Sequence, residues 1–177
     1  MARWVAARLA LRKGVTTRLW DPLELPFGNL QLRVREMPSV PPALEEFRQD
    51  IVNADGFVLV TPEYNFGLPG ALKNLLDLFF VEWHHKPFAL VGAGGISGGY
   101  RALDTLRIIV PGLVGVTIPT VLPVHRVETT FGPNGPVSDV ADWEQRADRL
   151  FVQLEWYARA LQRARAEGLP GAPARTG

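Results

Sequence analysis

The chain has 177 residues, of which 47% are hydrophobic and 21% are charged, values that fit one globular domain of ordinary size. Its net charge of +1, from 19 Lys and Arg against 18 Asp and Glu, argues against the basic surface of nucleic-acid or anionic-membrane binding proteins. The absence of cysteine excludes disulfides, thiolate nucleophiles and cysteine-ligated metals. No apolar run reaches the roughly 18 residues of a membrane span. We therefore expect a cytoplasmic protein without a nucleic-acid or membrane partner.

Helix-type and strand-type patterns alternate along the chain. Hydrophobic residues at near-helical spacing predict helices over residues 2–13, 43–54, 69–81, 100–110 and 139–167. Runs of apolar or β-branched residues predict strands over residues 15–20, 56–60, 87–91 and 114–121. Residues 21–42, with five prolines, and residues 122–138 are predicted loops, and the Gly-, Pro- and Ala-rich tail, residues 168–177, is predicted to be disordered.

This alternation predicts an α/β fold with a parallel sheet covered by helices on both faces. No internal repeat or linker divides the sequence, so we expect a single domain over residues 1–167. Ligands of open parallel sheets bind outside the carboxyl ends of the strands. Two loops leave such ends, at residues 61–68 and 92–99.

The first loop carries polar side chains with distinct uses. Asn65 offers both donors and an acceptor to the edge of a heterocycle, and Tyr64 offers an aromatic face. Gly67 allows close backbone approach to a ligand, and Glu63 is a candidate general base. The alternative is a plain turn between a strand and a helix, with Tyr64 filling a gap. The residues alone leave both interpretations open.

The second loop has five glycines among its eight residues, so it exposes backbone N–H groups near a predicted helix N-terminus. Such groups suit an anion or the polar edge of a ring, and the alternative is a flexible connection. Residues 95–99 also match the Gly-x-Ser-x-Gly pattern of serine hydrolases around Ser97. Asp104 is the only carboxylate between Ser97 and His125, and a glycine-rich loop matches this pattern easily, so we do not favour a hydrolase.

The histidines do not predict a metal site. His84 and His85 are adjacent, so their side chains point apart on a regular element, and His125 is remote in sequence. We interpret the pair as solvated or interface histidines.

Three stretches of the sequence resemble the NADPH-dependent FMN reductase family, which has a flavodoxin-like fold. The longest is Thr-Pro-Glu-Tyr-Asn at residues 61–65 with the strand before it, followed by Pro-Gly-Ala-Leu-Lys-Asn at residues 69–74. The second includes Lys-Pro at 86–87 and Gly-Gly-Tyr-Arg-Ala at 98–102, and the third, weaker one is residues 21–26. The resemblance implies a flavodoxin-like three-layer sandwich with a parallel sheet.

The resemblance also implies a function: transfer of a hydride from NADPH or NADH through FMN to a small acceptor such as a flavin or quinone. It implies no catalytic side chain and no metal, because the flavin carries the chemistry. Relatives of this kind are homodimers or homotetramers. The residues expected to bind the cofactor are Pro62, Glu63, Tyr64, Asn65, Ala93, Gly94 and Gly95.

The start of the chain departs from the family pattern. The family opens with a strand and a Gly-Ser-x-Arg-x-x-Ser loop for the FMN phosphate, whereas here the first strand is missing and residues 1–4 resemble the interior of the following helix. We expect Met1 to be a misassigned start, with the natural reading frame beginning about 20 residues earlier, enough for one strand and its loop. The alternative function is a flavin-free remnant of the fold that acts as a binding or oligomerisation module.

Overall fold

Three parallel strands form the central sheet: β1 (Phe57–Pro62), β2 (Pro87–Gly94) and β3 (Val116–His125), in the order β1-β2-β3. The structure is a computed structural model that describes residues 1–26 and 32–168. Residues 88–91 of β2 have no exposed surface, because helices cover both faces of the sheet. This burial explains why their sequence is a continuous apolar run rather than an alternating one.

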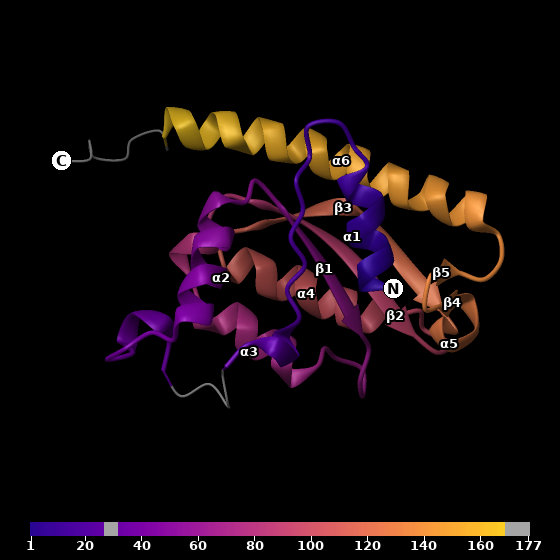
Figure 1. Cartoon of the computed structure of the whole chain (residues 1–177), viewed down its shortest axis with the longest axis horizontal. Coiled ribbons are helices and arrows are strands. Elements are labelled where there is room, and N and C mark those ends of the chain that lie inside the picture. The colour runs from indigo at the N-terminus through magenta and orange to yellow at the C-terminus, as the bar shows by residue number, and fades with distance from the viewer. Residues whose placement is uncertain (27–31, 169–177) are drawn as a thin grey trace.

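Helices form the two outer layers, one on each face of the sheet (Figure 1). Helices α1 (Ala2–Ala10) and α6 (Val140–Glu167) cover one face, where their apolar residues pack with Ala89 and Val91 of β2. The other face, around Phe88 and Leu90, is covered by α2 (Pro42–Asn53), α3 (Gly70–Leu78) and α4 (Tyr100–Gly112). Alternate residues of β2 therefore enter opposite cores. The predicted α/β three-layer sandwich with a parallel sheet is confirmed.

The predicted strand at residues 15–20 is wrong. This segment belongs to no strand and is held through side chains to α2: Arg18 Nε lies 3.0 Å from a carboxylate oxygen of Asp50, and Trp20 Nε1 donates to Asp50 at 2.8 Å. Composition had suggested a strand, but an extended segment becomes one only by pairing with a neighbour. Within residues 1–26 and 32–168, β1 pairs with β2 alone and its other edge has no strand beside it.

Strand β3 is longer than predicted and contains an irregularity. It pairs Thr117 with Phe88 but Val121 with Leu90, so extra residues around Pro119 bulge out of the register. The Thr120 N–H left out of the ladder donates to the side chain of Gln153 on α6, at 2.8 Å. A proline is tolerated here because β3 is an edge strand. The bulge allows β3 to continue to His125 instead of ending near Val121.

Short elements occupy the regions predicted as loops. They are the 3₁₀ turns η1 (Pro22–Glu24), η2 (Val34–Glu36) and η3 (Val81–Trp83), the helical turn α5 (Val127–Thr130), and the antiparallel pair β4 (Phe131–Gly132) and β5 (Gly135–Pro136). The predicted disordered tail lies outside the described residues apart from Gly168. None of the described helices is long and apolar enough to cross a membrane.

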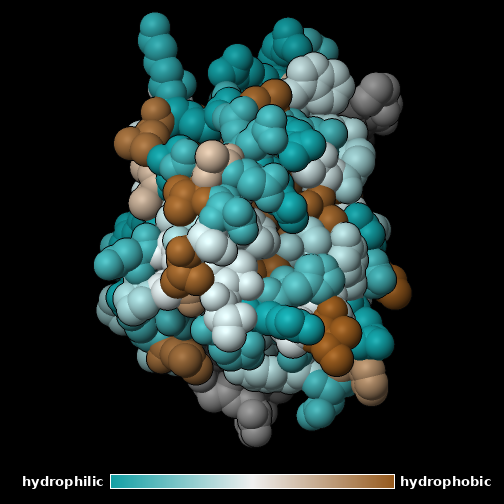
Figure 2. Space-filling model, turned by 90° about the vertical axis from the view of Figure 1, so that its right-hand side faces the viewer, coloured by the Kyte–Doolittle hydropathy of each residue, from teal (hydrophilic) through white to brown (hydrophobic). Residues whose placement is uncertain are grey.

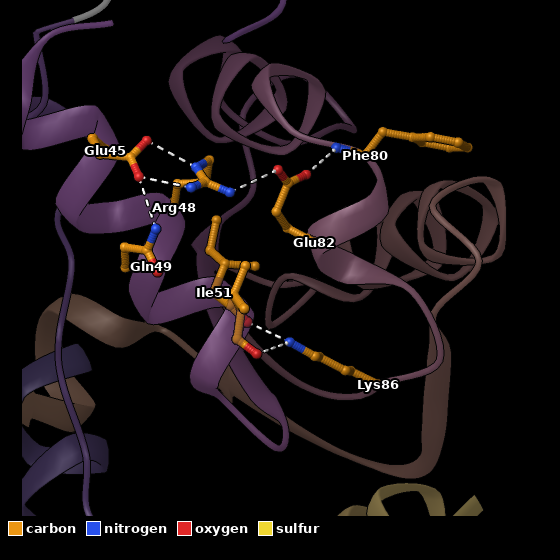
Figure 3. A network of polar contacts seen from close by, with 8 residues as sticks. Glu45, Arg48, Gln49, Ile51, Phe80, Glu82 and Lys86 are labelled. Atoms are coloured by element: carbon orange, nitrogen blue, oxygen red, sulfur yellow. Dashed lines mark hydrogen bonds and ion pairs between the residues drawn. The ribbon is translucent and has the colours of Figure 1, made fainter. Parts of the chain in front are cut away.

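A polar network ties α2 to the segment before β2 (Figure 3). The buried ammonium group of Lys86 donates to the carbonyls of Ile51 and Val52 at the end of α2, the latter at 2.8 Å. Arg48 lies between Glu45, at 2.7 Å, and Glu82, at 3.8 Å. Lys86 therefore satisfies carbonyl groups that every helix C-terminus leaves without an internal partner.

Candidate functional site

The register of the sheet brings the two predicted loops to one edge. Pro62 at the end of β1 lies beside Ala93 of β2, Ala93 lies beside Val124 of β3, and Gly94 lies beside His125. The carboxyl ends of all three strands therefore meet in one row. The seven residues expected to bind a cofactor belong to two segments that leave this row, residues 62–65 and 93–95.

The loop after β1 is shaped by a tight turn at residues 64–67. The Tyr64 N–H donates to the Gly67 carbonyl and the Gly67 N–H donates to the Tyr64 carbonyl, both at 2.9 Å. Asn65 and Phe66 have φ values of +48° and +67°, as a type I′ turn requires. Asparagine tolerates this left-handed backbone, whereas phenylalanine is strained in it. The turn displays two aromatic rings to solvent, with Tyr64 62% and Phe66 69% exposed.

The glycine-rich loop folds back tightly onto the end of β2. Gly98 and Gly99 have φ values of +62° and +85°, and a Cβ on Gly99 would lie 2.6 Å from the Ala93 nitrogen. Only glycine fits this close approach. At Gly95, by contrast, a Cβ would meet nothing within 4 Å. The loop thus combines a rigid base at residues 98–99 with open space above Gly95.

The same segment contains backbone donors without a partner. In the described chain, the N–H groups of Gly95, Ile96, Ser97 and Gly98 have no hydrogen-bond partner. Four consecutive donors without partners form a site for an anion or for the polar edge of a ring. This arrangement fits the ring-binding role predicted for Gly94 and Gly95.

Glu63 connects the two loops. Its N–H donates to the Ala93 carbonyl at 2.8 Å, and its carboxylate accepts from the backbone N–H of Arg101 at 3.1 Å and from the Arg101 guanidinium at 3.2 Å. The Ser97 hydroxyl lies close enough to this carboxylate to help lower its pKa. Burial raises the pKa of Glu63, but these hydrogen bonds outweigh it and leave the pKa below its ordinary value. The Glu63 carboxylate is therefore ionised and already bound within the protein.

The serine-hydrolase pattern does not assemble. The Ser97 hydroxyl accepts from the Gly99 N–H at 3.3 Å and lies close enough to Glu63 to lower the pKa of that carboxylate. The His125 ring uses Nδ1 on the Ile96 carbonyl, at 2.8 Å. Neither group activates the other, so the geometry lacks the nucleophile–base hydrogen bond of this chemistry. Among the described residues, no group of His, Asp or Glu side chains is placed to hold a metal ion.

Sequence reasoning missed three residues at this edge. His125 lies beside Gly98, Arg101 binds Glu63, and Phe66 stacks under the Arg101 guanidinium, with its ring centre 4.4 Å from Cζ. His125 was missed because β3 was predicted to end at Val121. The Gly-Tyr-Arg segment at residues 99–101 was visible in the sequence, but nothing in it indicated that Arg101 would meet Glu63.

A cavity of about 530 Å³ lies elsewhere, between α1 and α6. Its carboxylates are already paired: Glu144 with Arg8 at 3.0 Å, and Asp148 and Glu155 with Arg12. It therefore offers no set of free polar groups that converge on a ligand. Figure 2 shows the side of the molecule on which α5, β4 and β5 lie, where apolar side chains form small separate areas on a mostly hydrophilic surface.

The chain is similar to several known oxidoreductases. An NAD(P)H:quinone oxidoreductase of Solanum tuberosum is 39% identical over 99 residues, which cover 54% of this chain and 50% of that protein. A probable NADPH:quinone oxidoreductase of Oryza sativa is 33% identical over 153 residues, 80% of this chain and 71% of that protein. The NAD(P)H:(acceptor) oxidoreductase FerB of Paracoccus denitrificans has the same fold, with a TM-score of 0.66 and 20% identity over 89% of this chain and 87% of that one.

These matches cover different shares of the chain and of the relatives. The chain spans half the length of the potato relative, so that protein's activity is not transferred with the likeness. The family match is broader. The sequence pattern of the NADPH-dependent FMN reductase family matches residues 1–129, which contain the three-stranded sheet and both loops. The chain therefore belongs to the NADPH-dependent FMN reductase family.

Proposed function

We propose that the chain binds the flavin ring of FMN and takes part in the transfer of a hydride from NADPH or NADH to a quinone, a flavin or a similar small acceptor. The observation that supports the proposal is the register of Pro62, Ala93 and Val124, because it brings to one edge of the sheet the two loops that we expect to bind the ring. Family membership and the names of the relatives support the choice of cofactor and acceptor.

The residues present fit the ring of the cofactor. The four free N–H groups at residues 95–98 suit the polar edge of the ring, and the open space above Gly95 leaves room for it. Pro62, Tyr64 and Asn65 would line the opposite side from the loop after β1. When bound, FMN would supply the hydride chemistry, so no side chain needs to act as acid, base or nucleophile.

The residues present do not account for the phosphate of FMN. The Gly-Ser-x-Arg-x-x-Ser segment does not occur in the sequence. The proposal therefore predicts that the chain recognises the ring more strongly than the phosphate.

Titration with FMN and with riboflavin tests this directly. Flavin fluorescence should be quenched by the protein, and the two dissociation constants should agree within about threefold, because phosphate contacts normally contribute much more than the 0.6 kcal/mol that this ratio represents. Anaerobic addition of NADPH should then bleach the bound flavin near 450 nm. Binding of neither flavin at high micromolar concentration would refute the proposal and favour the flavin-free binding module.

The acceptor side of the proposal rests on apolar groups around the two loops. Phe66, Tyr64 and Ile96 are exposed beside the proposed ring site, and a strained Phe66 is the kind of local conflict that functional sites retain. These surfaces suit a planar apolar acceptor such as a quinone. Steady-state assays with a quinone, free FMN and an azo dye would rank the acceptors.

We also propose a cytoplasmic homodimer or homotetramer. The proposal rests on the resemblance of the sequence to a family of homodimers and homotetramers, because a single exposed residue such as Ile108 on α4 does not define a subunit contact. Light scattering after size-exclusion chromatography measures the oligomer, and cell fractionation tests the location. A monomer at 50 µM would contradict the assembly.

A further inference from the structure

Glu63 was expected to touch the cofactor or to act as a base, but its surroundings indicate another role. Its side chain is only 8% exposed, and each donor to its carboxylate comes from the segment that follows β2. Both donors belong to Arg101, one on its backbone and one on its guanidinium, and the Ser97 hydroxyl lies close enough to help lower the pKa of Glu63. The carboxylate thus joins the loop after β1 to the loop after β2.

The contact reaches both parts of the second loop. Ser97 lies within the glycine-rich turn, and its hydroxyl also accepts the Gly99 N–H at 3.3 Å. Arg101 is in the first turn of α4, and its backbone N–H is one of the groups that a helix N-terminus leaves unpaired. Glu63 therefore fixes the turn and the start of the helix together.

Arg101 also contacts the first loop, through Phe66. Its guanidinium lies over the Phe66 ring at 4.4 Å while it binds Glu63 at 3.2 Å. Phe66 occupies the strained position of the turn at residues 64–67. The stacking, which is of the cation–π type, therefore helps to keep the aromatic tip in place.

We propose that Glu63 is a positioning residue that locks the glycine-rich loop and the turn at residues 64–67 into the arrangement that receives the flavin ring, and that its carboxylate neither contacts the ring nor moves a proton. The role in binding rests on the proposed function, whereas the lock itself is a property of the protein alone. An ionised carboxylate with several donors is a poor general base near neutral pH. It is a good electrostatic anchor for a helix N-terminus.

The first test is hydrogen exchange of the flavin-free full chain, wild type against Glu63→Gln. The glutamine keeps the size of the side chain and one acceptor oxygen, but it removes the charge and replaces the other oxygen with an NH2 donor, so it cannot accept from the Arg101 N–H and guanidinium at once. We expect exchange of the hydrogen-bonded amides of residues 99–101 to be about tenfold faster, the effect of losing one hydrogen bond to a charged group. Glu46→Gln is the matched control, because Glu46 forms an exposed pair with Arg18 at 2.6 Å, away from both loops. Unchanged exchange in Glu63→Gln would overturn the lock.

The second test separates positioning from proton transfer. In Glu63→Gln we expect the FMN dissociation constant to rise about tenfold, while kcat at saturating FMN changes less than threefold. A kcat lowered a hundredfold at saturating FMN would identify Glu63 as a reacting group and overturn the proposal. Arg101→Met should weaken FMN binding by a similar factor, and adding it to Glu63→Gln should produce little further loss. Fully additive effects would show that the two residues act separately.

Failure of the two proposals gives different results. If the protein binds no flavin, the proposed function is refuted and the exchange experiment still decides whether the lock exists. Circular dichroism of each variant at 20 °C confirms that the fold is retained. Should Glu63→Gln unfold, Arg101→Met removes the guanidinium donor to the carboxylate and should give a smaller acceleration in the same amides.

Discussion

Gly99 and Gly95 lie four residues apart in one loop, yet the structure assigns them opposite roles, and an alanine at each position tests this. At Gly99 the backbone φ is +85°, and an added Cβ would lie 2.6 Å from the Ala93 nitrogen and 2.8 Å from Gly92. These neighbours are backbone atoms of β2, which cannot move aside as the end of a flexible side chain can. Gly99→Ala is therefore both strained and overpacked.

The magnitude follows from these two effects. A left-handed conformation costs an alanine about 1–2 kcal/mol, and forcing a methyl group into a packed site costs about 1–3 kcal/mol. We expect Gly99→Ala to lower the free energy of unfolding by about 2–5 kcal/mol, a large fraction of the 5–15 kcal/mol typical of a domain. At Gly95 the same methyl group meets nothing within 4 Å. Gly95→Ala should leave stability unchanged or raise it by up to about 1 kcal/mol.

Flavin binding, unlike stability, should be impaired in Gly95→Ala. A methyl group in the space proposed for the flavin edge should weaken flavin binding about 10- to 100-fold, in line with the effect of one methyl group in a fitted pocket. Urea denaturation followed by tryptophan fluorescence measures stability, and flavin quenching measures binding. Equal losses of stability in the two variants would refute our description of the loop. Unaltered flavin binding by Gly95→Ala would refute its place at the ring.

Three further outcomes are expected. Burial and nearby Arg165 lower the pKa of Lys86 from 10.5 to about 8. The unfolded chain therefore holds the Lys86 proton more tightly than the folded protein does. The free energy of unfolding should rise by about 1–3 kcal/mol between pH 8 and 10.5. Urea titrations at pH 8, 9 and 10 should show this rise in wild type but not in Lys86→Met, and equal slopes would contradict the assignment. Phe66→Gly should raise stability by about 0.5–1 kcal/mol, because Asn-Gly is the preferred type I′ pair, and a loss above 1 kcal/mol would show that stacking on arginine outweighs the strain. Arg165→Met removes bonds to the His85 carbonyl at 2.9 Å and to Asp55 at 3.0 Å. It should cost about 1 kcal/mol and speed amide exchange in the last turns of α6 alone.

The layers of the fold could be predicted because their signals are local. The apolar runs of β1 and β2 and the helical spacing of α2, α4 and α6 place these elements within a few residues of their observed bounds. The strand at residues 15–20 was wrong because β-branched composition says nothing about a partner. The end of β3 was missed because residues 122–138 were predicted as one loop, whereas Leu122 to His125 continue the pairing with β2 beyond the bulge.

The candidate site could likewise be predicted only in part. The two loops could be located from strand ends and glycine content, and parallel topology implied that they would meet. The contacts between them could not be predicted. Glu63 and Arg101 are 38 residues apart in sequence, and their meeting depends on how tightly Gly98 and Gly99 fold the second loop onto β2.

The two loops achieve their shapes by different physical means, and this difference bears on how the site works. The second loop uses glycines, so its tight return to β2 involves no strain at residues 98–99. The first loop places a phenylalanine where glycine would fit better, and the conformation persists through two turn hydrogen bonds and stacking on Arg101. Strain of this kind is kept only where surrounding contacts fix it. Because Arg101 is in turn held by Glu63, the aromatic tip and the donor-rich loop are set relative to each other before any ligand arrives. In a site organised in this way, the ordering of its loops on ligand binding costs less free energy.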